Sequence, residues 1–247
     1  MNPSILNFKI VQIDSGLSTN IYAQKLLRLE NVQEGLVLQT DFQKDGKGQH
    51  EKKWEAEIGK NLLFSILLQP NLTVEKQFLL SKAVSVGLKN YIDSLSVGDI
   101  KIKWPNDILV NGEKLAGILI ENSIYGTLIK SSVVGIGFNV NQLHFEDFQR
   151  PATSLAKLSG KLFNLKETLE NLLISIKSAY KLMSASPNKL DKIYLQGLYG
   201  IGQPMTFEDK NGKFIGVILG VLPNGRIQLN HNGKLKDYDL KELIFLD

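Results

Sequence analysis

Alternating and continuous apolar segments divide most of the chain into predicted strands and helices. Residues 8–13 alternate between apolar and polar side chains, as in a strand with one covered face. Residues 61–69 (NLLFSILLQ) are almost continuously apolar, as in a strand covered on both faces. Apolar positions at helical spacing predict helices, one of which is expected to begin at a Thr73 cap. The pattern predicts an α+β domain with strands at residues 8–13, 35–40, 61–69, 100–104, 108–110, 115–120 and 128–140, and helices at 19–30, 73–93, 154–159, 165–183 and 188–199.

Residues 103–121 (KWPNDILVNGEKLAGILIE) combine a hairpin pattern with charged groups that folding alone does not require. The Asn-Gly pair at 111–112 lies between two apolar segments, and its residues tolerate the positive φ angles of a type I′ turn. Asn106 and Asp107 precede the first strand of this hairpin, and Lys114 opens the second. A carboxylate, an amide and an ammonium are therefore expected to converge at one edge of a sheet, where they would suit a phosphate group and a metal ion.

The C-terminal segment has a different pattern. Its short alternating stretches are separated by Asn-Gly pairs at 211–212, 224–225 and 232–233, each of which is a hairpin signal. We therefore expect a small SH3-like β-barrel here. The change in pattern predicts two domains, residues 1–199 and 200–247.

Composition narrows the classes of function. The 247 residues include no cysteine, which excludes disulfide bonds, thiol nucleophiles and cysteine-based zinc sites. No apolar run approaches the roughly 18 residues of a membrane span, and the N-terminal residues have no signal-peptide core, so we expect a cytoplasmic protein without membrane contact. The net charge of +4 is not gathered in a basic patch, because acidic and basic residues balance in 41–60 and in 196–247. No nucleic-acid partner is expected.

Three further segments carry polar groups at the ends of predicted elements. They are residues 18–20 (Ser-Thr-Asn) at a helix start, Gln43 with the glycine-containing loop that ends at Trp54, and residues 139–141 (Asn-Val-Asn) after a strand. Each also has an ordinary structural interpretation, as a helix cap, a surface loop or a strand end. P-loop and serine-nucleophile motifs are absent and the three histidines are scattered, so the candidate site consists of the hairpin and these segments.

KWPND and KLAGILIE at this spacing, with the glycine-basic loop before them and VVGIGFNVN and ATSL after them, closely resemble the biotin protein ligases. The resemblance extends from about residue 14 to the end of the chain. It implies a central mixed β-sheet with flanking helices, as in class II aminoacyl-tRNA synthetases and biotin and lipoate ligases, plus the small SH3-like barrel. Some members carry an N-terminal winged-helix repressor domain. Because only about a dozen residues precede the first motif, we expect the short form without the DNA-binding domain.

The resemblance also implies a reaction and a set of residues. The family converts biotin and ATP, with Mg²⁺, to biotinyl-5′-AMP and passes the biotinyl group to a lysine of a biotin carboxyl carrier protein or domain. Lys114 matches the catalytic lysine that bridges the biotin carboxylate and the α-phosphate, and Asp107 matches the aspartate near the triphosphate and the metal. The predicted biotin-binding residues are Ser18, Thr19, Asn20, Gln43, Lys47, Gly48, Gln49, Lys114 and Gly117, and the predicted ATP-binding residues are Lys47, Gln49, Trp54, Asn106, Asp107, Lys114 and Asn139.

The glycine loop departs from the family pattern. The usual form is G-R-G-R-x-G-R-x-W, whereas residues 46–54 read GKGQHEKKW. Gln49 replaces an arginine that helps to hold the adenylate, which leaves its retention open, and Lys52 or Lys53 is a candidate for the missing charge. The glycines and the scarcity of apolar side chains favour a loop that orders over the intermediate and shields it from water.

Two other readings stay open on the sequence. A lipoate-type ligase would share the fold and the adenylation chemistry, although no R-R-x-[ST]-G-G-G segment occurs. A non-catalytic module that binds biotin or nucleic acid would not need Lys114 and Asp107. The chain could be a monomer or a homodimer.

Overall fold

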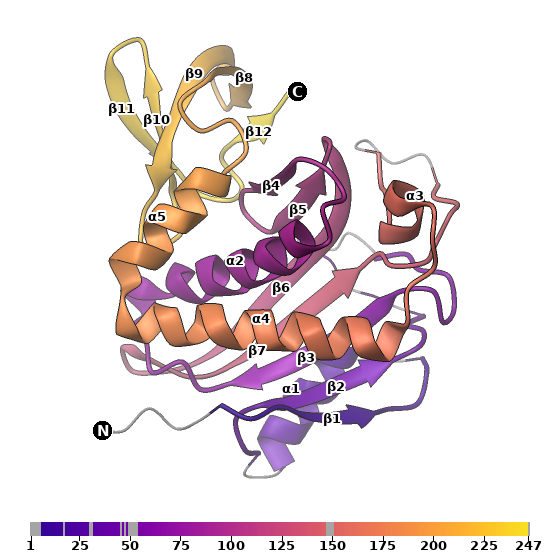
Figure 1. The fold of residues 1–247 in the computed structure, drawn as a ribbon. Helices are drawn as coiled ribbons and strands as arrows, with labels where there is room; N and C mark the ends of the chain where they lie inside the picture. Colours follow the sequence, from indigo (N-terminus) through magenta and orange to yellow (C-terminus); the bar gives the residue numbers. More distant parts are fainter. Residues whose placement is uncertain are drawn as a thin grey trace.

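The computed structural model describes residues 6–16, 18–29, 32–44, 46, 48, 54–146 and 151–246, whose strands form two separate sheets (Figure 1). The larger has seven strands in the order β1-β2-β3-β7-β6-β5-β4, and the smaller has five in the order β11-β10-β9-β8-β12. The elements are β1 (Lys9–Gln12), α1 (Thr19–Leu29), β2 (Leu36–Thr40), β3 (Leu62–Leu68), the 3₁₀ helix η2 (Val74–Lys76), α2 (Phe78–Ser94), β4 (Ile100–Lys103), β5 (Asp107–Val110), β6 (Glu113–Tyr125), β7 (Leu128–Phe138), α3 (Leu155–Ser159), α4 (Leu165–Ala185), α5 (Pro187–Gly197), β8 (Pro204–Asp209), β9 (Gly212–Val221), β10 (Ile227–His231), β11 (Lys234–Tyr238) and β12 (Ile244–Phe245).

The large sheet is mixed and has helices on both faces, which confirms the predicted fold class. Strands β1 and β2 are parallel, whereas the other neighbours in this sheet are antiparallel. Helices α2 and α4 lie across one face (Figure 1), and the core there includes Phe64 and Phe138. Helix α1 covers part of the opposite face, where Ala23 packs with Leu38 and Val133. The seven residues of β3 are therefore buried on both sides, as its continuous apolar run predicts.

The predicted hairpin is present between β5 and β6. Asn111 and Gly112 have φ angles of 52° and 84°, the positive values that a type I′ turn requires. The register shifts where Ile108 pairs with Ala116 and Leu109 with Lys114, so Leu115 is the extra residue of a bulge in β6.

The predicted cap at Thr73 is wrong. Thr73 precedes the 3₁₀ helix η2 but makes no side-chain cap hydrogen bond, and its backbone bridges to Leu128 at the start of β7. A short 3₁₀ turn follows, and α2 begins only at Phe78, whose N–H donates to the carbonyl of Pro223 at 3.1 Å. Helix α2 thus begins against the C-terminal part of the chain, a contact that its local sequence does not encode.

The C-terminal strands form the predicted small antiparallel β-domain. The Asn-Gly pair at 232–233 occupies a two-residue turn between β10 and β11 with both φ angles positive. The other two pairs also lie at hairpins. At 211–212 the two-residue loop lies one position before the Asn-Gly pair, since Asp209 pairs with Gly212. At 224–225 the loop between β9 and β10 is longer than two residues. No helix in the described part of the chain is long and apolar enough to cross a membrane.

Candidate functional site

Two glycines on neighbouring strands form an open platform on the face of the large sheet that α1 partly covers. Gly117 of β6 and Gly137 of β7 are partners in the register, and Asp107 of β5 is the partner of Gly117 on its other side. The indole of Trp54 packs against both glycines. A Cβ atom on Gly137 would lie 2.3 Å from the indole, and one on Gly117 would lie 2.9 Å from it. Larger residues at either position would displace the ring.

Lys114 and Asp107 meet beside this platform. Nζ of Lys114 lies 2.8 Å from Oδ1 of Asp107 and 5.5 Å from the centroid of the Trp54 ring. The backbone of Lys114 is held by the neighbouring segment, because its N–H donates to Pro151 and its carbonyl accepts from the N–H of Thr153. Both charged side chains are partly exposed, so a ligand can reach the pair.

Asn106 lies next to this pair, but part of its side chain is used internally. Its Nδ2 donates to the carbonyl of Ile118 at 2.9 Å, and the N–H of Ile118 donates to the carbonyl of Asn106 at 2.9 Å. This clamp fixes the start of β5 against β6. The predicted contact of Asn106 with a nucleotide stays a prediction.

Three of the predicted ATP-binding residues carry a buried polar atom without a hydrogen-bond partner in the described part of the chain. These atoms are Nε1 of Trp54, Oδ1 of Asp107 and Oδ1 of Asn139. Oδ1 of Asp107 is close to Lys114, but the alignment is not that of a hydrogen bond. Leaving such an atom unpaired costs about 1–3 kcal/mol, which calls for an explanation. A polar ligand that accepts from the indole and donates to or bridges the two oxygens would remove this cost.

Two of the predicted biotin-binding residues at the start of α1, Thr19 and Asn20, belong to a second cluster that hydrogen bonds connect. The N–H of Thr19 donates to Oε1 of Gln43 at 2.7 Å, so this side chain ties the start of the helix to the loop after β2. Oγ of Ser65 lies 2.7 Å from Oγ1 of Thr19 and 2.6 Å from Oδ1 of Asn20. Nδ2 of Asn20 in turn donates to the carboxylate of Glu121 at 2.8 Å. Ser18, Thr19 and Asn20 are all buried.

The two clusters lie over the same face of strand β7. Gly135 and Gly137 are two residues apart on β7 and therefore face the same side of the sheet. A Cβ atom on Gly135 would lie 2.3 Å from Oδ1 of Asn20, just as one on Gly137 would meet Trp54. The structure thus brings residues 18–20, Gln43, Trp54, Asp107, Lys114 and Asn139 to one region around a row of glycines.

Some predicted residues cannot be placed. Lys47 and Gln49 lie outside the described residues, as do the substitutions at 49–53 that distinguish the glycine loop and the proposed closure of that loop. Gly46 and Gly48 are described, and the N–H of Trp54 donates to the carbonyl of Gly46 at 2.9 Å. This bond brings the two ends of the loop together at the platform.

The sequence prediction missed Ser65, Glu121 and the glycines of β7. Ser65 was visible as the single polar interruption inside the apolar run of β3, and Glu121 ends the KLAGILIE motif. Neither could be assigned to the site from local pattern, since their partners on α1 lie 45 or more positions away.

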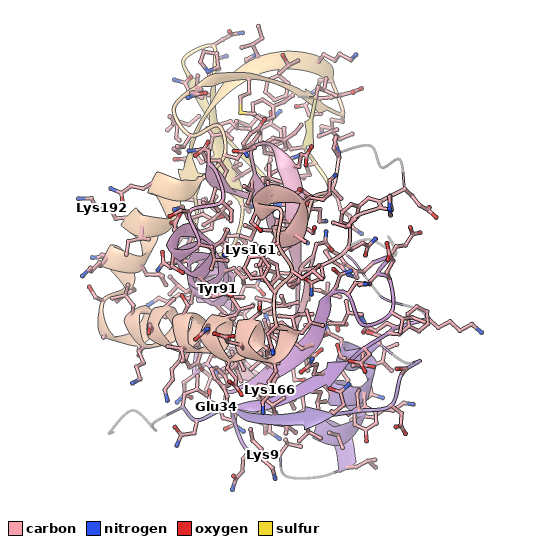
Figure 2. All side chains as sticks on the ribbon, turned by 45° about the vertical axis from the view of Figure 1, so that its right-hand side comes forward. Lys9, Glu34, Tyr91, Lys161, Lys166 and Lys192 are labelled. Atoms are coloured by element: carbon pink, nitrogen blue, oxygen red, sulfur yellow. The ribbon has the colours of Figure 1, made fainter. Side chains whose placement is uncertain are left out.

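A cavity of about 520 Å³ lies elsewhere, between the C-terminal part of α2 and the N-terminal part of α4, where Figure 2 labels Tyr91. Burial is the main cause that raises the pKa of the Tyr91 hydroxyl. None of the predicted site residues lines this cavity. The candidate site is therefore the glycine platform.

Comparisons with known proteins place the chain among relatives of one family. The model of the Biotin/lipoate A/B protein ligase family matches residues 13–139, which end at Asn139. The chain is 28% identical over 240 residues to "Bifunctional ligase/repressor BirA" of Bacillus subtilis, covering 96% of this chain and 74% of the relative. It is 32% identical over 188 residues to "Biotin--protein ligase 1, chloroplastic" of Arabidopsis thaliana, covering 71% of this chain and 49% of the relative.

The fold has close counterparts among solved structures. The biotin protein ligase of Aquifex aeolicus in complex with biotin and ATP superimposes with a TM-score of 0.77 and 25% identity, covering 96% of this chain and 97% of that one. The similarity spans both sheets.

Proposed function

We propose, from the premise that the chain belongs to the Biotin/lipoate A/B protein ligase family, that it is a biotin protein ligase. It activates biotin with ATP to biotinyl-5′-AMP, releasing pyrophosphate, and transfers the biotinyl group to a lysine of a biotin carboxyl carrier protein or domain. The names of its relatives support the ligase activity, and the Aquifex complex supports the two small substrates.

One observation carries the proposal. Nε1 of Trp54 and Oδ1 of Asn139 have no hydrogen-bond partner among the described residues, and Oδ1 of Asp107 has an ion pair with Lys114 but no hydrogen bond. One is a donor and two are acceptors, so the missing partner is a polar molecule with both kinds of group, as an adenine nucleotide with its bound cation would be.

The first step joins two anions, since a carboxylate of biotin must attack the α-phosphorus of ATP. The protein's task is then to neutralise charge and hold the reactants in line. Lys114 has a compact charge that can follow the oxygen as the new C–O–P bond forms and pyrophosphate leaves. Its contact with Asp107 holds the ammonium beside the ring of Trp54.

The residues also fit a magnesium ion. Oδ1 of Asp107 is a buried carboxylate oxygen without a hydrogen-bond partner among the described residues. These residues include no group of three or more His, Cys, Asp or Glu side chains that could hold a metal. Magnesium commonly uses one or two carboxylates plus the phosphates of its substrate, so Asp107 would hold it together with the triphosphate. When bound, the ion neutralises charge on the phosphates.

The second cluster suits the opposite end of biotin. A ureido ring has two N–H donors and one carbonyl acceptor, which need partners when they are buried. Thr19 supplies a hydroxyl at the start of α1, and Gln43 supplies an amide from the loop after β2. The apolar strands would enclose the rest of the molecule.

Transfer then needs only an amine. The ε-amino group of the acceptor lysine attacks the carbonyl of the mixed anhydride, an amide bond forms, and AMP leaves with its bonding electron pair. The carboxylase-linked names of relatives support a carboxyl carrier as acceptor.

The test is an incubation of the whole protein with ATP, Mg²⁺ and either biotin or lipoate, in the presence of an isolated biotin carboxyl carrier domain. We expect pyrophosphate release and label on the carrier with biotin only. Activity with lipoate only would make the chain a lipoate-type ligase, and binding of biotin without pyrophosphate release would make it a non-catalytic module.

A further inference from the structure

A chain of short hydrogen bonds lies beneath the proposed biotin site, and Ser65 of β3 is its centre. Ser65 has no exposed surface (0%), and its hydroxyl touches Thr19 and Asn20 of α1 at once. Its sheet partner Gly135 has no side chain, which leaves room for Asn20 above it. Ser65 is the one polar side chain of its strand. Burial of this hydroxyl therefore costs free energy unless it is fully hydrogen-bonded.

The orientation of the Asn20 amide is fixed by its surroundings. One end of the amide faces the carboxylate of Glu121 at 2.8 Å and the carbonyl of Leu119 at 3.3 Å, and both of these groups accept hydrogen bonds. That end must be Nδ2, because only the nitrogen donates. The other end, 2.6 Å from Ser65, is therefore the oxygen, which can only accept.

The number of available protons then fixes the direction in which the Thr19 hydroxyl donates. Ser65 has a single hydroxyl proton, and Oδ1 of Asn20 requires it. The 2.7 Å contact between Ser65 and Thr19 consequently needs the proton of Thr19, which donates to Ser65. The other acceptor near this proton, Oε1 of Gln43, is at 3.4 Å and is already engaged by the N–H of Thr19 at 2.7 Å. Because its proton is used by Ser65, the Thr19 hydroxyl can only accept a further hydrogen bond.

Gln43 is oriented by the same reasoning. Its Oε1 faces a backbone N–H, so the donor end of the amide is the one that points away from Thr19. The site thus offers an acceptor at Thr19 and a donor at Gln43. This is the complement of an N–H next to a C=O, which is the edge of a ureido group.

We propose that Ser65 is a positioning residue that sets the polarity of this site, so that Thr19 accepts from a ureido N–H and does not compete as a donor. The inference rests on the proposed function, because it takes biotin as the ligand. Ser65 does not touch the ligand and acts through Thr19. Glu121 holds the far end of the chain by fixing Asn20.

The test is Ser65→Ala, with KM and kcat measured separately in biotin-dependent pyrophosphate exchange. Without Ser65 the Thr19 proton is free to turn toward Gln43 or the ligand, and we expect KM for biotin to rise about tenfold or more, as for a lost buried hydrogen bond. KM for ATP and kcat should stay within about threefold, since binding of the ureido group is lost equally in the ground and transition states.

Ser132→Ala is the matched control. Ser132 is also a fully buried strand serine of the large sheet, and its hydroxyl donates to Oδ1 of Asn122 at 2.7 Å, outside the chain of bonds below the site. We expect a similar loss of thermal stability and no change in KM for biotin. An equal rise in KM in this control would overturn the proposal, because loosening of the sheet would then explain the effect.

Thr19→Val provides a second criterion. If Ser65 acts through Thr19, Ser65→Ala should add little to KM in the Thr19→Val background, whereas independent effects would multiply. Ser65→Cys, which fills a similar space with a weak donor, serves the same cycle if Ser65→Ala does not fold. A normal KM in the Ser65 variants with an active wild type would refute the role of Ser65 alone. An absence of biotin-dependent exchange in the wild type would refute both this role and the proposed function.

Discussion

Lys114 and Asp107 contribute little to the stability of the fold. Both side chains are partly exposed, and such ion pairs are typically worth about 0–1 kcal/mol. The sequence already indicated them, because a lysine and an aspartate at the two ends of an apolar hairpin have no packing role. Ser65 illustrates the opposite case. Its partners come from a helix 45 positions away, so its contacts are visible only once the chain is folded.

Replacing Lys114 with alanine should abolish the first reaction and spare the fold. We expect biotin-dependent pyrophosphate exchange to fall by about 10²–10³-fold or more, because the positive charge that offsets the two reacting anions is gone. The free energy of unfolding should change by less than about 1 kcal/mol. We therefore expect the pyrophosphate exchange assay to show almost no activity, while unfolding by denaturant is nearly the same as in the wild type. Near-wild-type exchange in Lys114→Ala would remove this residue from the mechanism.

The β5–β6 hairpin presents both charged residues, and its turn conformation holds them in register. The predicted Asn-Gly turn is confirmed, with φ angles of 52° and 84°. Turn chemistry of this kind is local and can be predicted from two residues. The start of α2 could not be predicted in the same way, since the N–H of its first residue, Phe78, donates to the carbonyl of Pro223 far along the chain.

Gly112→Ala should destabilise this hairpin. A Cβ atom there meets nothing within 4 Å, so the effect isolates the strain of an L-residue at φ 84°. We expect a loss of about 1–2 kcal/mol in the free energy of unfolding by urea. Gly112→Asn is the control. Asparagine adopts the left-handed region more readily than alanine, so this variant should lose less unfolding free energy. Equal losses in the two variants would show that backbone strain is not the cause.

The strand ends of the small sheet carry a pH-dependent interaction. The ammonium of Lys236, the N–H of Asn211 and the hydroxyl of Tyr238 lower the pKa of Asp209 from 3.8 to about 2. Because the folded pKa lies below the unfolded one, this contribution to stability is complete above about pH 4 and is lost as the pH falls toward 2.

The substitution Asp209→Asn tests whether the Asp209 carboxylate makes this pH-dependent contribution to stability. The difference in unfolding free energy between wild type and variant should be constant from pH 7 to about 4 and should shrink below that. Urea unfolding at pH 7, 4 and 3 measures it. A difference that does not depend on pH would assign the effect of the substitution to packing.

The two sheets are joined by hydrogen bonds from the first part of the chain to the loop and strand end around residues 221–225. Nζ of Lys82 donates to the carbonyl of Val221 at 2.7 Å, and Nε1 of Trp104 donates to that of Gly225 at 2.9 Å. Trp104 directly precedes the segment that carries Asn106 and Asp107, so the small sheet also supports the candidate site. The two predicted domains followed from sequence periodicity. Their contact did not, because it joins residues more than 100 positions apart.

Lys82→Met should weaken this contact. Lys82 is buried and also pairs with Asp191, and the methionine keeps the packing of the side-chain stem while leaving the carbonyl of Val221 unpaired. We expect a loss of about 1–3 kcal/mol in unfolding free energy and faster proteolysis near residues 221–225. Lys89→Met is the control, since Lys89 forms an i,i+4 pair with Asp93 on the same helix, worth about 0.3–0.5 kcal/mol. Equal losses would argue against a special role of Lys82.

The proposed reaction begins when the carboxylate of biotin attacks the α-phosphorus of ATP. Biotin labelled with heavy oxygen in its carboxylate tests it in one measurement, with the whole protein, ATP, Mg²⁺ and a carrier domain. We expect one heavy oxygen in the released AMP for each biotinyl group transferred, found by mass spectrometry. Heavy oxygen in inorganic phosphate with ADP as the nucleotide product, or unlabelled AMP, would contradict it.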